Sequence, residues 1–236
     1  MELQEILKNL RTQKRSNSNL PDTGWKILPT TQEYNHQGVL VDVPNPRHEV
    51  VGKFLYECYR IEVENRFGNM ERPDEEKFKR ILSFMTTQNA KCGLILYGYV
   101  GTGKTTYMKA MEATIRCLYK EELQNRQLTM RSCQASELGQ MLKEHKEDYD
   151  TLKKSSILFV DDIGFAGDAE VVNNYGVKTD PIIDIVEYRY SKQLFTVFTT
   201  NLSEDGITKR YGNRIYSRLY EMCKWICFKG KDYRIK

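Results

Sequence analysis

The sequence predicts an α/β protein built on a five-stranded, mainly parallel sheet flanked by helices. Two observations predict this fold. From residue 91 onward, apolar runs of strand length alternate with amphipathic helical segments, which is the pattern of βαβ units. The first of these strands also ends in a glycine-rich turn, "GYVGTGKTT" (98–106), that leads directly into a helix.

The composition fits such a protein and excludes several other classes. With 236 residues, 40% of them hydrophobic and 29% charged, the chain can bury a full core. No apolar run approaches the ~20 residues of a membrane span, and residues 1–21 lack the small-residue cleavage site of a secretory signal. We therefore expect a cytoplasmic protein without a membrane partner, whose six scattered cysteines are free thiols.

The N-terminus is predicted to form an amphipathic helix. Within residues 1–12, the apolar side chains of Leu3, Ile6, Leu7 and Leu10 fall on one helical stripe. A polar stretch with a proline and a glycine follows, so this helix is joined loosely to the rest. It is a candidate for binding a partner protein, and packing against its own domain is an equally good interpretation.

We divide the chain into three parts. Residues 1–45 are assigned to a small helical, partly flexible extension that binds a partner, 46–90 to a helical linker, and 91–236 to the core. Within the linker, hydrophobic periodicity predicts helices over residues 48–66 and 74–85.

Strands and helices alternate along the core. The predicted strands cover residues 93–98, 127–133, 156–162, 194–201 and 225–230. The predicted helices cover residues 104–119, 136–147, 180–193 and 203–212. Asp180 is the expected N-cap of the third helix, with Pro181 at the first helical position, where its fixed φ is favourable. Ser203 is expected to cap the fourth helix and Gly212 to end it.

The glycine-rich turn predicts a nucleotide-binding loop, because it matches G-x-x-x-x-G-K-[ST] without a mismatch. Glycines let successive N–H groups point inward around an anion, and the following helix adds the positive end of its dipole. Lys104 is expected to reach the β- and γ-phosphates of ATP, while the Thr105 hydroxyl binds Mg²⁺. The candidate nucleotide-binding residues are Gly98, Gly101, Thr102, Gly103, Lys104, Thr105 and Thr106.

The third strand, in "ILFVDDIG" (157–164), ends in two adjacent carboxylates. Unpaired charges are costly to bury, so these acids require a cation or solvent. Asp161 is assigned to Mg²⁺ together with Thr105. Asp162 is assigned as the base that orients the attacking water, and a capping acid is the alternative.

Two further candidate catalytic groups follow the fourth strand. Asn201, at the strand end, can hydrogen-bond the γ-phosphate or the attacking water. Arg214 and Arg218 are four residues apart on one helical face, and no acid at matching spacing neutralises Arg218. Arg218 is therefore assigned as an arginine finger that reaches the nucleotide of a neighbouring subunit, with a surface salt bridge as the alternative.

The order of these motifs resembles that of the AAA+ ATPases, in particular the bacterial replicative-helicase loaders of the DnaC/DnaI type and the related IstB-like transposition helpers. The resemblance rests on "GYVGTGKTT", "ILFVDDIG", "FTTNLS", "RYGNRIYSRLYEMC" and "FKGKDYR", and it covers residues 91–236. It implies a P-loop AAA+ core in which residues 98–105 are Walker A, Asp161 and Asp162 are Walker B, and Asn201 is sensor 1.

The same resemblance implies an activity and partners. Arg218 would be the arginine finger, with Arg214 as its neighbour in the same motif. The cofactors would be ATP and Mg²⁺, and ATP binding would drive homo-oligomerisation. The partners would be single-stranded DNA and a replicative helicase, or a transposase in the alternative. The expected function is ATP-driven switching of an assembly on single-stranded DNA.

The sequence departs from the family pattern in several places. Asp162 stands where many AAA+ proteins have glutamate, so hydrolysis is expected to be slow and switch-like. The segment 147–156 is brief, which leaves little room for an inserted DNA-contacting helix. We expect no C-terminal lid domain after the fifth strand, and Arg234 is a weak candidate near the nucleotide. The segment 164–181 is longer than a simple loop and can contact a neighbour or DNA.

Charge adds a modest indication of nucleic-acid binding. The net charge is +4, and residues 204–236 hold nine Lys/Arg against four acids. Lys209, Arg210 and Lys224 are the candidate phosphate contacts, and a solvated basic face is an equally good interpretation. Two other classes remain as alternatives: a small-molecule kinase, for which no acceptor pocket or mobile lid is visible, and a scaffold that binds ATP without turnover.

Overall fold

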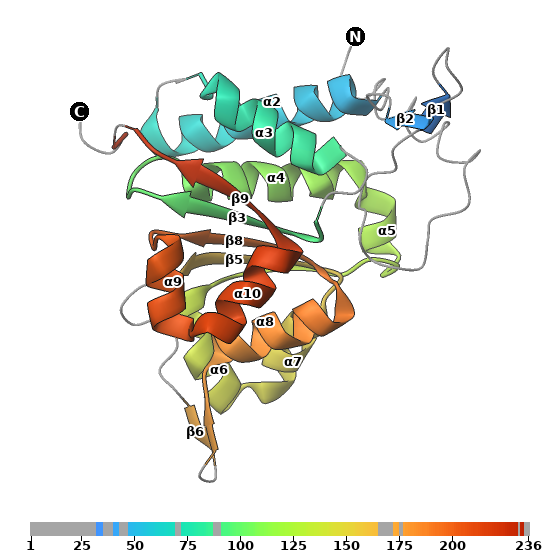
Figure 1. Cartoon of the computed structure of the whole chain (residues 1–236). Coiled ribbons are helices and arrows are strands. Elements are labelled where there is room, and N and C mark those ends of the chain that lie inside the picture. Colours follow the sequence, from blue (N-terminus) through green and yellow to red (C-terminus); the bar gives the residue numbers. More distant parts are fainter. Residues whose placement is uncertain are drawn as a thin grey trace.

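The computed structural model describes residues 32–34, 40–42, 47–68, 72–86, 91–164, 172–174, 177–230 and 232–233. Within them, the predicted five-stranded parallel sheet with flanking helices is confirmed (Figure 1). The predicted helix over residues 1–12 and Arg234 lie outside the described residues. No lid domain is found among the described residues after the last strand.

The central sheet has the strand order β4-β5-β8-β3-β9, and every neighbouring pair is parallel. Its strands are β3 (Gly93–Gly98), β4 (Met130–Gln134), β5 (Ile157–Ile163), β8 (Phe195–Thr200) and β9 (Cys223–Phe228). The chain leaves β3 toward β4 on one side of the sheet and later adds β9 on the other side. Ligands of open α/β sheets bind at the carboxyl ends of the strands where the strand order changes direction in this way.

Three helices cover one face of the sheet: α2 (Arg47–Phe67), α3 (Glu75–Thr86) and α4 (Lys104–Leu118) (Figure 1). Their buried side chains, among them Leu55, Ile81 and Met111, form one hydrophobic cluster with β3, β8 and β9. The segment 46–90, predicted as a helical linker, thus contributes two helices to the core of the protein.

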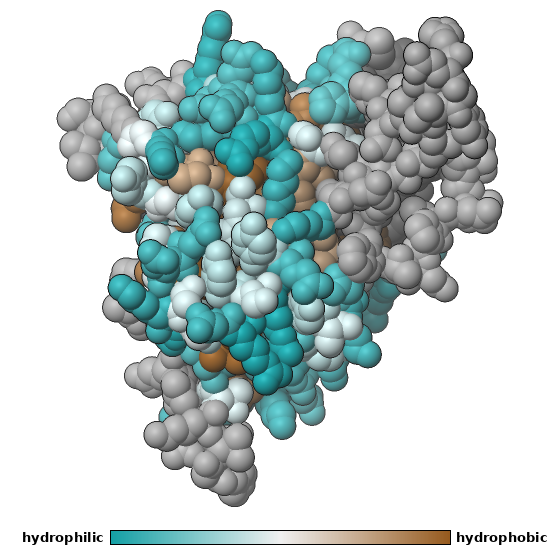
Figure 2. Space-filling model, in the orientation of Figure 1, coloured by the Kyte–Doolittle hydropathy of each residue, from teal (hydrophilic) through white to brown (hydrophobic). Residues whose placement is uncertain are grey.

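The opposite face is covered by α6 (Leu138–Glu144), α7 (Lys146–Lys154), α8 (Pro181–Lys192), α9 (Glu204–Tyr211) and α10 (Asn213–Met222). A second hydrophobic cluster lies between these helices and the sheet. Since both faces are covered, β5 is buried from Ile157 to Asp161, which explains its unbroken apolar run. The face seen in Figure 2 is mostly hydrophilic, with only small hydrophobic patches.

The expected helix caps of the core are confirmed. The Asp180 carboxylate accepts hydrogen bonds from the backbone N–H groups of Ile182 and Ile183, at 2.9 and 3.3 Å, and Pro181 opens α8. Ser203 Oγ accepts from the Gly206 N–H at 3.1 Å, and α9 ends at Gly212.

The prediction of one helix over 136–147 followed by a brief connector at 147–156 is wrong. The chain forms the 3₁₀ turn η1 (Ala135–Glu137), then α6, and after a break at His145 the additional helix α7. Tyr149 and Leu152 of α7 are three residues apart and buried, so the helix has an apolar face that the prediction missed.

Several short elements were not predicted. They are the antiparallel pair β1 (Gln32–Tyr34) and β2 (Leu40–Asp42), the helix α5 (Lys120–Gln124), and the antiparallel pair β6 (Val172–Asn174) and β7 (Val177–Thr179). The last pair lies in the segment 164–181 and projects from the domain (Figure 1). Four strand starts also differ from the prediction: β4 begins at 130 rather than 127 and β9 at 223 rather than 225, while β5 and β8 each begin one residue later than predicted.

One buried arginine fixes α8 against α7 and the sheet. Arg189 is fully buried, and its guanidinium donates to the carbonyls of Lys153, Ser155 and Phe195 at 2.7–2.8 Å and to Thr196 Oγ1 at 2.7 Å. Burial lowers the pKa of Arg189 to about 9, which leaves it charged at neutral pH. None of the described carboxylates forms an ion pair with it, so backbone carbonyls and a hydroxyl supply its hydrogen bonds.

A helix that spans a lipid bilayer needs about 20 mostly apolar residues. None of the described helices combines the length and the hydrophobicity that a membrane span requires.

Candidate functional site

The glycine-rich loop connects β3 to α4, as the motif predicts. Gly98 has φ +127°, and a Cβ there would lie 2.3 Å from the carbonyl oxygen of Phe228 in β9. Gly103, with φ +93°, directly precedes α4. Both positions lie in the region of φ that favours glycine, so the loop curls tightly against the sheet. Tyr233 closes over it, donating its backbone N–H to the Gly101 carbonyl at 3.0 Å.

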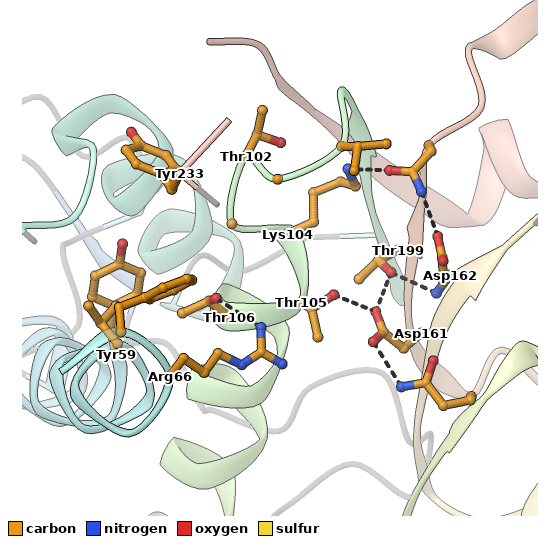
Figure 3. Close-up of a pocket in the computed structure, with 17 residues that line it drawn as sticks. Tyr59, Arg66, Thr102, Lys104, Thr105, Thr106, Asp161, Asp162, Thr199 and Tyr233 are labelled. Carbon is orange, nitrogen blue, oxygen red and sulfur yellow. Dashed lines mark hydrogen bonds between the residues drawn. The ribbon is translucent and has the colours of Figure 1, made fainter. Parts of the chain in front are cut away.

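Lys104 lies inside this loop with its ammonium group held by oxygen atoms. The side chain is 6% exposed, and Nζ donates to the carbonyls of Gly98 and Tyr99 at 2.9 and 2.6 Å. A third bond, of 2.7 Å, runs to Asn201 Oδ1 at the end of β8. The cation is therefore placed between the loop and the ends of the neighbouring strands (Figure 3).

Asp161 ends the buried part of β5 and lies opposite the loop. Its Oδ1 accepts hydrogen bonds from Thr105 Oγ1 at 2.9 Å and Thr199 Oγ1 at 2.5 Å, and its Oδ2 accepts from Gln134 Nε2 at 3.1 Å. The carboxylate is 5% exposed. The predicted pairing of Thr105 with Asp161 across the site is thus present in the structure (Figure 3).

The Asp162 carboxylate has different partners from that of Asp161, because strand β5 is irregular at this position. The pairing register of β5 with β8 shifts between Val160 and Ile163, and Asp162 has φ +62°, which is uncommon for a residue other than glycine. Such bulges re-aim side chains next to functional sites. The Asp162 carboxylate accepts from Asn201 Nδ2 at 2.8 Å, so Asn201 joins Asp162 to Lys104.

Magnesium and a nucleotide fit the residues present. Hydroxyl and carboxylate oxygens of the Thr105–Asp161 pair suit Mg²⁺, which is commonly held by one or two protein carboxylates plus phosphates rather than by an all-protein cage. Among the described residues, no cluster of three metal-binding side chains offers a different kind of metal site. The loop supplies positive charge and backbone N–H groups for phosphates.

These residues line one cavity of about 370 Å³. Of the predicted nucleotide-binding residues, Gly101 and the run Thr102–Thr106 line it, together with Asp161, Asp162 and Asn201. Gly98 is not a lining residue, and its role is to shape the loop.

Several lining residues were not predicted from the sequence. Gln134 and Thr199 are polar residues at or near the carboxyl ends of β4 and β8. Their positions could have predicted a place in the site, because these strand ends meet at one edge of the sheet. The C-terminal half of α2 and Tyr233 also line the cavity. No local motif in the sequence marks that helix as part of the site.

Arg218 is not a lining residue of this cavity, and it has an acidic partner that the sequence did not reveal. Glu187 Oε1 lies 2.6 Å from Arg218 Nη1 and 3.2 Å from Arg214 Nε. No acid at matching helical spacing was expected to neutralise Arg218, but Glu187 reaches it from α8, so the salt bridge that was the alternative interpretation is present. One carboxylate serves two guanidinium groups, and Arg218 also lies 5.3 Å from the ring centre of Tyr190.

The three candidate phosphate contacts lie on two elements. Lys209 and Arg210 are on α9, where Arg210 Nη1 is 3.1 Å from Asp180 Oδ2, and Lys224 is on β9. Burial lowers the pKa of Lys224.

Comparison with solved structures gives three likenesses of low identity. The crystal structure of the DnaC helicase loader is 22% identical, with 67% of this chain and 94% of that chain covered and a TM-score of 0.49. The crystal structure of DnaI is 23% identical, with 79% and 98% covered and a TM-score of 0.49. AMPPCP-bound DnaA from Aquifex aeolicus is 18% identical, with 84% and 51% covered and a TM-score of 0.41. No curated protein sequence matches the chain.

The family comparison is more direct. The pattern of the ATPase family associated with various cellular activities (AAA) matches residues 94–219, which is more than half of the chain. The matched region runs from β3 through the aspartates of β5 to α10, so it contains the glycine-rich loop, both aspartates, Asn201 and Arg218. The chain therefore belongs to the AAA family of ATPases.

Proposed function

We propose that this protein binds and hydrolyses ATP and uses the cycle to switch an assembly on single-stranded DNA, as a loader of a replicative helicase. The observation that carries the nucleotide part is the connected network in one cavity: Lys104 to Asn201, Asn201 to Asp162, and Thr105 to Asp161. Each is a hydrogen bond between groups that the motif assigns to phosphate, water and metal.

In this proposal the residues divide the work by position. The loop N–H groups and Lys104 bind the phosphates, and the Thr105–Asp161 pair holds Mg²⁺. Bound Mg²⁺ neutralises phosphate charge during transfer. Asp162, held by Asn201, orients a water molecule and accepts its proton. The positive φ of Asp162 directs this carboxylate away from the metal pair, which gives the two adjacent acids separate roles.

Arg218 acts in another subunit in this proposal. It does not line the cavity of its own chain, so a role in hydrolysis would require it to reach the nucleotide of a neighbouring subunit. Glu187 balances one of the two arginines beside it, which leaves one net positive charge on this surface for the phosphates of a partner. An arginine supplied in trans would make hydrolysis depend on assembly.

The loader function rests on the motif resemblance, above all that of residues 199–223, and on membership of the AAA family. Lys209, Arg210 and Lys224 are proposed as phosphate contacts to single-stranded DNA, for which binding should weaken steeply with salt. The residues preceding α2 are proposed to bind the helicase.

A mixing experiment tests the trans-acting arginine. ATP hydrolysis is measured for the wild type, Asp162→Asn, Arg218→Ala, and an equimolar mixture of the two variants, each with and without single-stranded DNA. We expect both variants to be inactive alone and the mixture to recover activity, because a mixed neighbour pair contains one complete site. Equal inactivity of the mixture beside an active wild type would reject the trans assignment.

Capture of the helicase tests the biological assignment. The chain is immobilised with ATP or without nucleotide and incubated with the replicative helicase of its host, and the chain lacking residues 1–45 is the control. Capture should require both ATP and the N-terminal residues. Absence of helicase capture, with capture of a transposase in a parallel incubation, would favour the transposition-helper alternative.

A further inference from the structure

The C-terminal half of α2 forms a wall of the cavity opposite the aspartates. Tyr59, Val63, Arg66 and Phe67 all line it, and their spacing of four, seven and eight residues places them on one face of the helix. The helix is held there by packing on α4, with Tyr59 lying against Tyr107 at a ring-centre distance of 4.6 Å. Figure 3 shows Tyr59 and Tyr233 on one side of the loop and the two aspartates on the other.

This arrangement sets the orientation of a bound nucleotide in the cavity. The γ-phosphate end belongs beside Asp162 and Asn201, which lie next to the Lys104 ammonium. The aromatic side, with Tyr59 and Tyr233, then receives the base. The phosphates nearer the ribose must cross the space between these two ends, past the first turn of α4.

Arg66 reaches into that intermediate space. Its Nη1 lies 3.4 Å from Thr106 Oγ1, in the first turn of α4 and one residue after the Mg²⁺-assigned Thr105. In Figure 3 the guanidinium extends from α2 toward Thr105 and Thr106. A guanidinium presents a planar fork of N–H donors that matches phosphate oxygens.

Within the described part of the domain, no carboxylate neutralises the charge of Arg66. None of the described carboxylates forms an ion pair with it, and Arg66 is exposed to solvent. Arg60, two turns earlier on the same helix, has the opposite surroundings, because Glu57 and Glu64 pair with it at 3.0 and 2.7 Å. The two arginines therefore offer a matched comparison within one helix.

We propose that Arg66 binds, in its own chain, the diphosphate that ATP and ADP share. The inference rests on the proposed nucleotide site and extends it to a helix that precedes the matched family region. Bound nucleotide then bridges α2 and α4, so it adds a contact between two helices that already pack together. Arg66 supplies a cis-acting cation, whereas Arg218 serves the neighbouring subunit.

Nucleotide affinity tests this assignment. Dissociation constants for ATP, ADP and adenosine are measured by calorimetry, with Mg²⁺ present, for the wild type, Arg66→Ala, Arg66→Lys and the control Arg60→Ala. We expect Arg66→Ala to weaken ATP and ADP about tenfold each, the size of one charged hydrogen bond at an accessible site. Arg66→Lys should fall between this variant and the wild type, and Arg60→Ala should match the wild type. Adenosine binding should not change.

The remaining outcomes separate two kinds of failure. Unchanged ATP and ADP binding by Arg66→Ala, a loss confined to ATP, or an equal loss in Arg60→Ala would each overturn the assignment of Arg66 to the shared diphosphate. If the wild type binds neither nucleotide, or if Lys104→Ala binds as tightly as the wild type, the proposed nucleotide site itself fails. Far-ultraviolet circular dichroism of each variant verifies that α2 remains folded.

Discussion

Strand β8 has a polar cluster at each end, and the two clusters differ in what surrounds them. At its start, Arg189 donates to the carbonyl of Phe195 and to Thr196 Oγ1, and to carbonyls near the end of α7. At its end, Thr199 and Asn201 hydrogen-bond the aspartates and Lys104 beside a cavity. The first cluster is closed by protein on all sides, whereas the second opens to solvent.

The difference shows how a buried charge can be structural in one place and functional in another. The partners of Arg189 are three backbone carbonyls and one buried hydroxyl, which cannot move without moving the strand and helices that carry them. Lys104, Asp161 and Asn201 meet largely through side-chain atoms at the edge of a cavity, and such atoms can exchange partners when a ligand enters. We therefore expect the first cluster to control stability and the second to control binding.

The largest expected effect is on folding, from Arg189→Met. This change leaves three carbonyls and Thr196 Oγ1 without their buried donor, and we expect the free energy of unfolding to fall by about 3–5 kcal/mol. Urea unfolding followed by circular dichroism measures the change. Arg116→Met is the control, because the Arg116 side chain is 52% exposed and its ion pair with Glu112, four residues earlier on the same helix, is worth ~0.5 kcal/mol or less. If the free energy of unfolding of Arg189→Met fell by less than about 1 kcal/mol, the Arg189 cluster would not be the one that controls stability.

The next effect is on affinity, from Lys104→Ala. Its ammonium is the cation of the second cluster, and loss of its charged hydrogen bonds to phosphate should weaken ATP binding on the order of a hundredfold. The free energy of unfolding should change far less than in Arg189→Met. Calorimetry and urea unfolding on the same preparation measure both quantities. An intact affinity would show that the second cluster is as structural as the first.

A smaller effect is expected from Thr199→Val, which keeps the shape of a side chain that is 1% exposed. Thr199 Oγ1 donates to Asp161 and accepts the Asp162 backbone N–H at 2.8 Å, so the change removes the bridge between the two acids. We expect about 1–2 kcal/mol of destabilisation and a higher Mg²⁺ concentration for half-maximal ATP binding. Thr196→Val, at the Arg189 end of the strand, should destabilise without altering the Mg²⁺ requirement.

The smallest expected effect is on the reactivity of two thiols, the partly exposed Cys117 and the buried Cys92. A hydrogen bond from Cys58 lowers the pKa of Cys117 below that of an ordinary thiol, whereas burial raises the pKa of Cys92 to about 11. Because the thiolate is the reactive form, the alkylation rate of Cys117 should rise with a midpoint at a lower pH than that of an ordinary thiol, while Cys92 stays unreactive at pH 8. Peptide mass spectrometry after iodoacetamide treatment reads both sites. In Cys58→Ala the midpoint should move upward, and an unmoved midpoint would contradict the role of Cys58.

Much of the fold and the centre of the site could be predicted because their signals are local. A strand, a glycine-rich turn and a helix are contiguous in "GYVGTGKTT", and the alternation of elements after residue 91 indicates a parallel sheet. Asp161 follows from the same logic, since a charge at the end of a buried strand requires a partner. Confirmation of the Asp180 and Ser203 caps also rests on local chemistry.

The features that were missed depend on residues far apart in sequence. Glu187 meets Arg218 only because α8 and α10 lie side by side, and spacing along one helix could not reveal it. Arg66 reaches the loop because α2 packs on α4, a contact between segments that α3 and β3 separate along the chain. The positive φ of Asp162 depends on the register shift against β8, which no single strand encodes.

One measurement tests the contrast between the two clusters most directly: thermal unfolding of the wild type, Arg189→Met and Lys104→Ala with and without Mg²⁺ and ATP. A ligand at a hundred times its dissociation constant stabilises the folded state by about 2.7 kcal/mol. We predict this increment for the wild type and for the less stable Arg189→Met, and only about 0.4 kcal/mol for Lys104→Ala, whose hundredfold weaker binding leaves it half-saturated at the same ATP concentration. An equal increment in Lys104→Ala, or its loss in a folded Arg189→Met, would contradict the assignment of binding to one end of β8 and stability to the other.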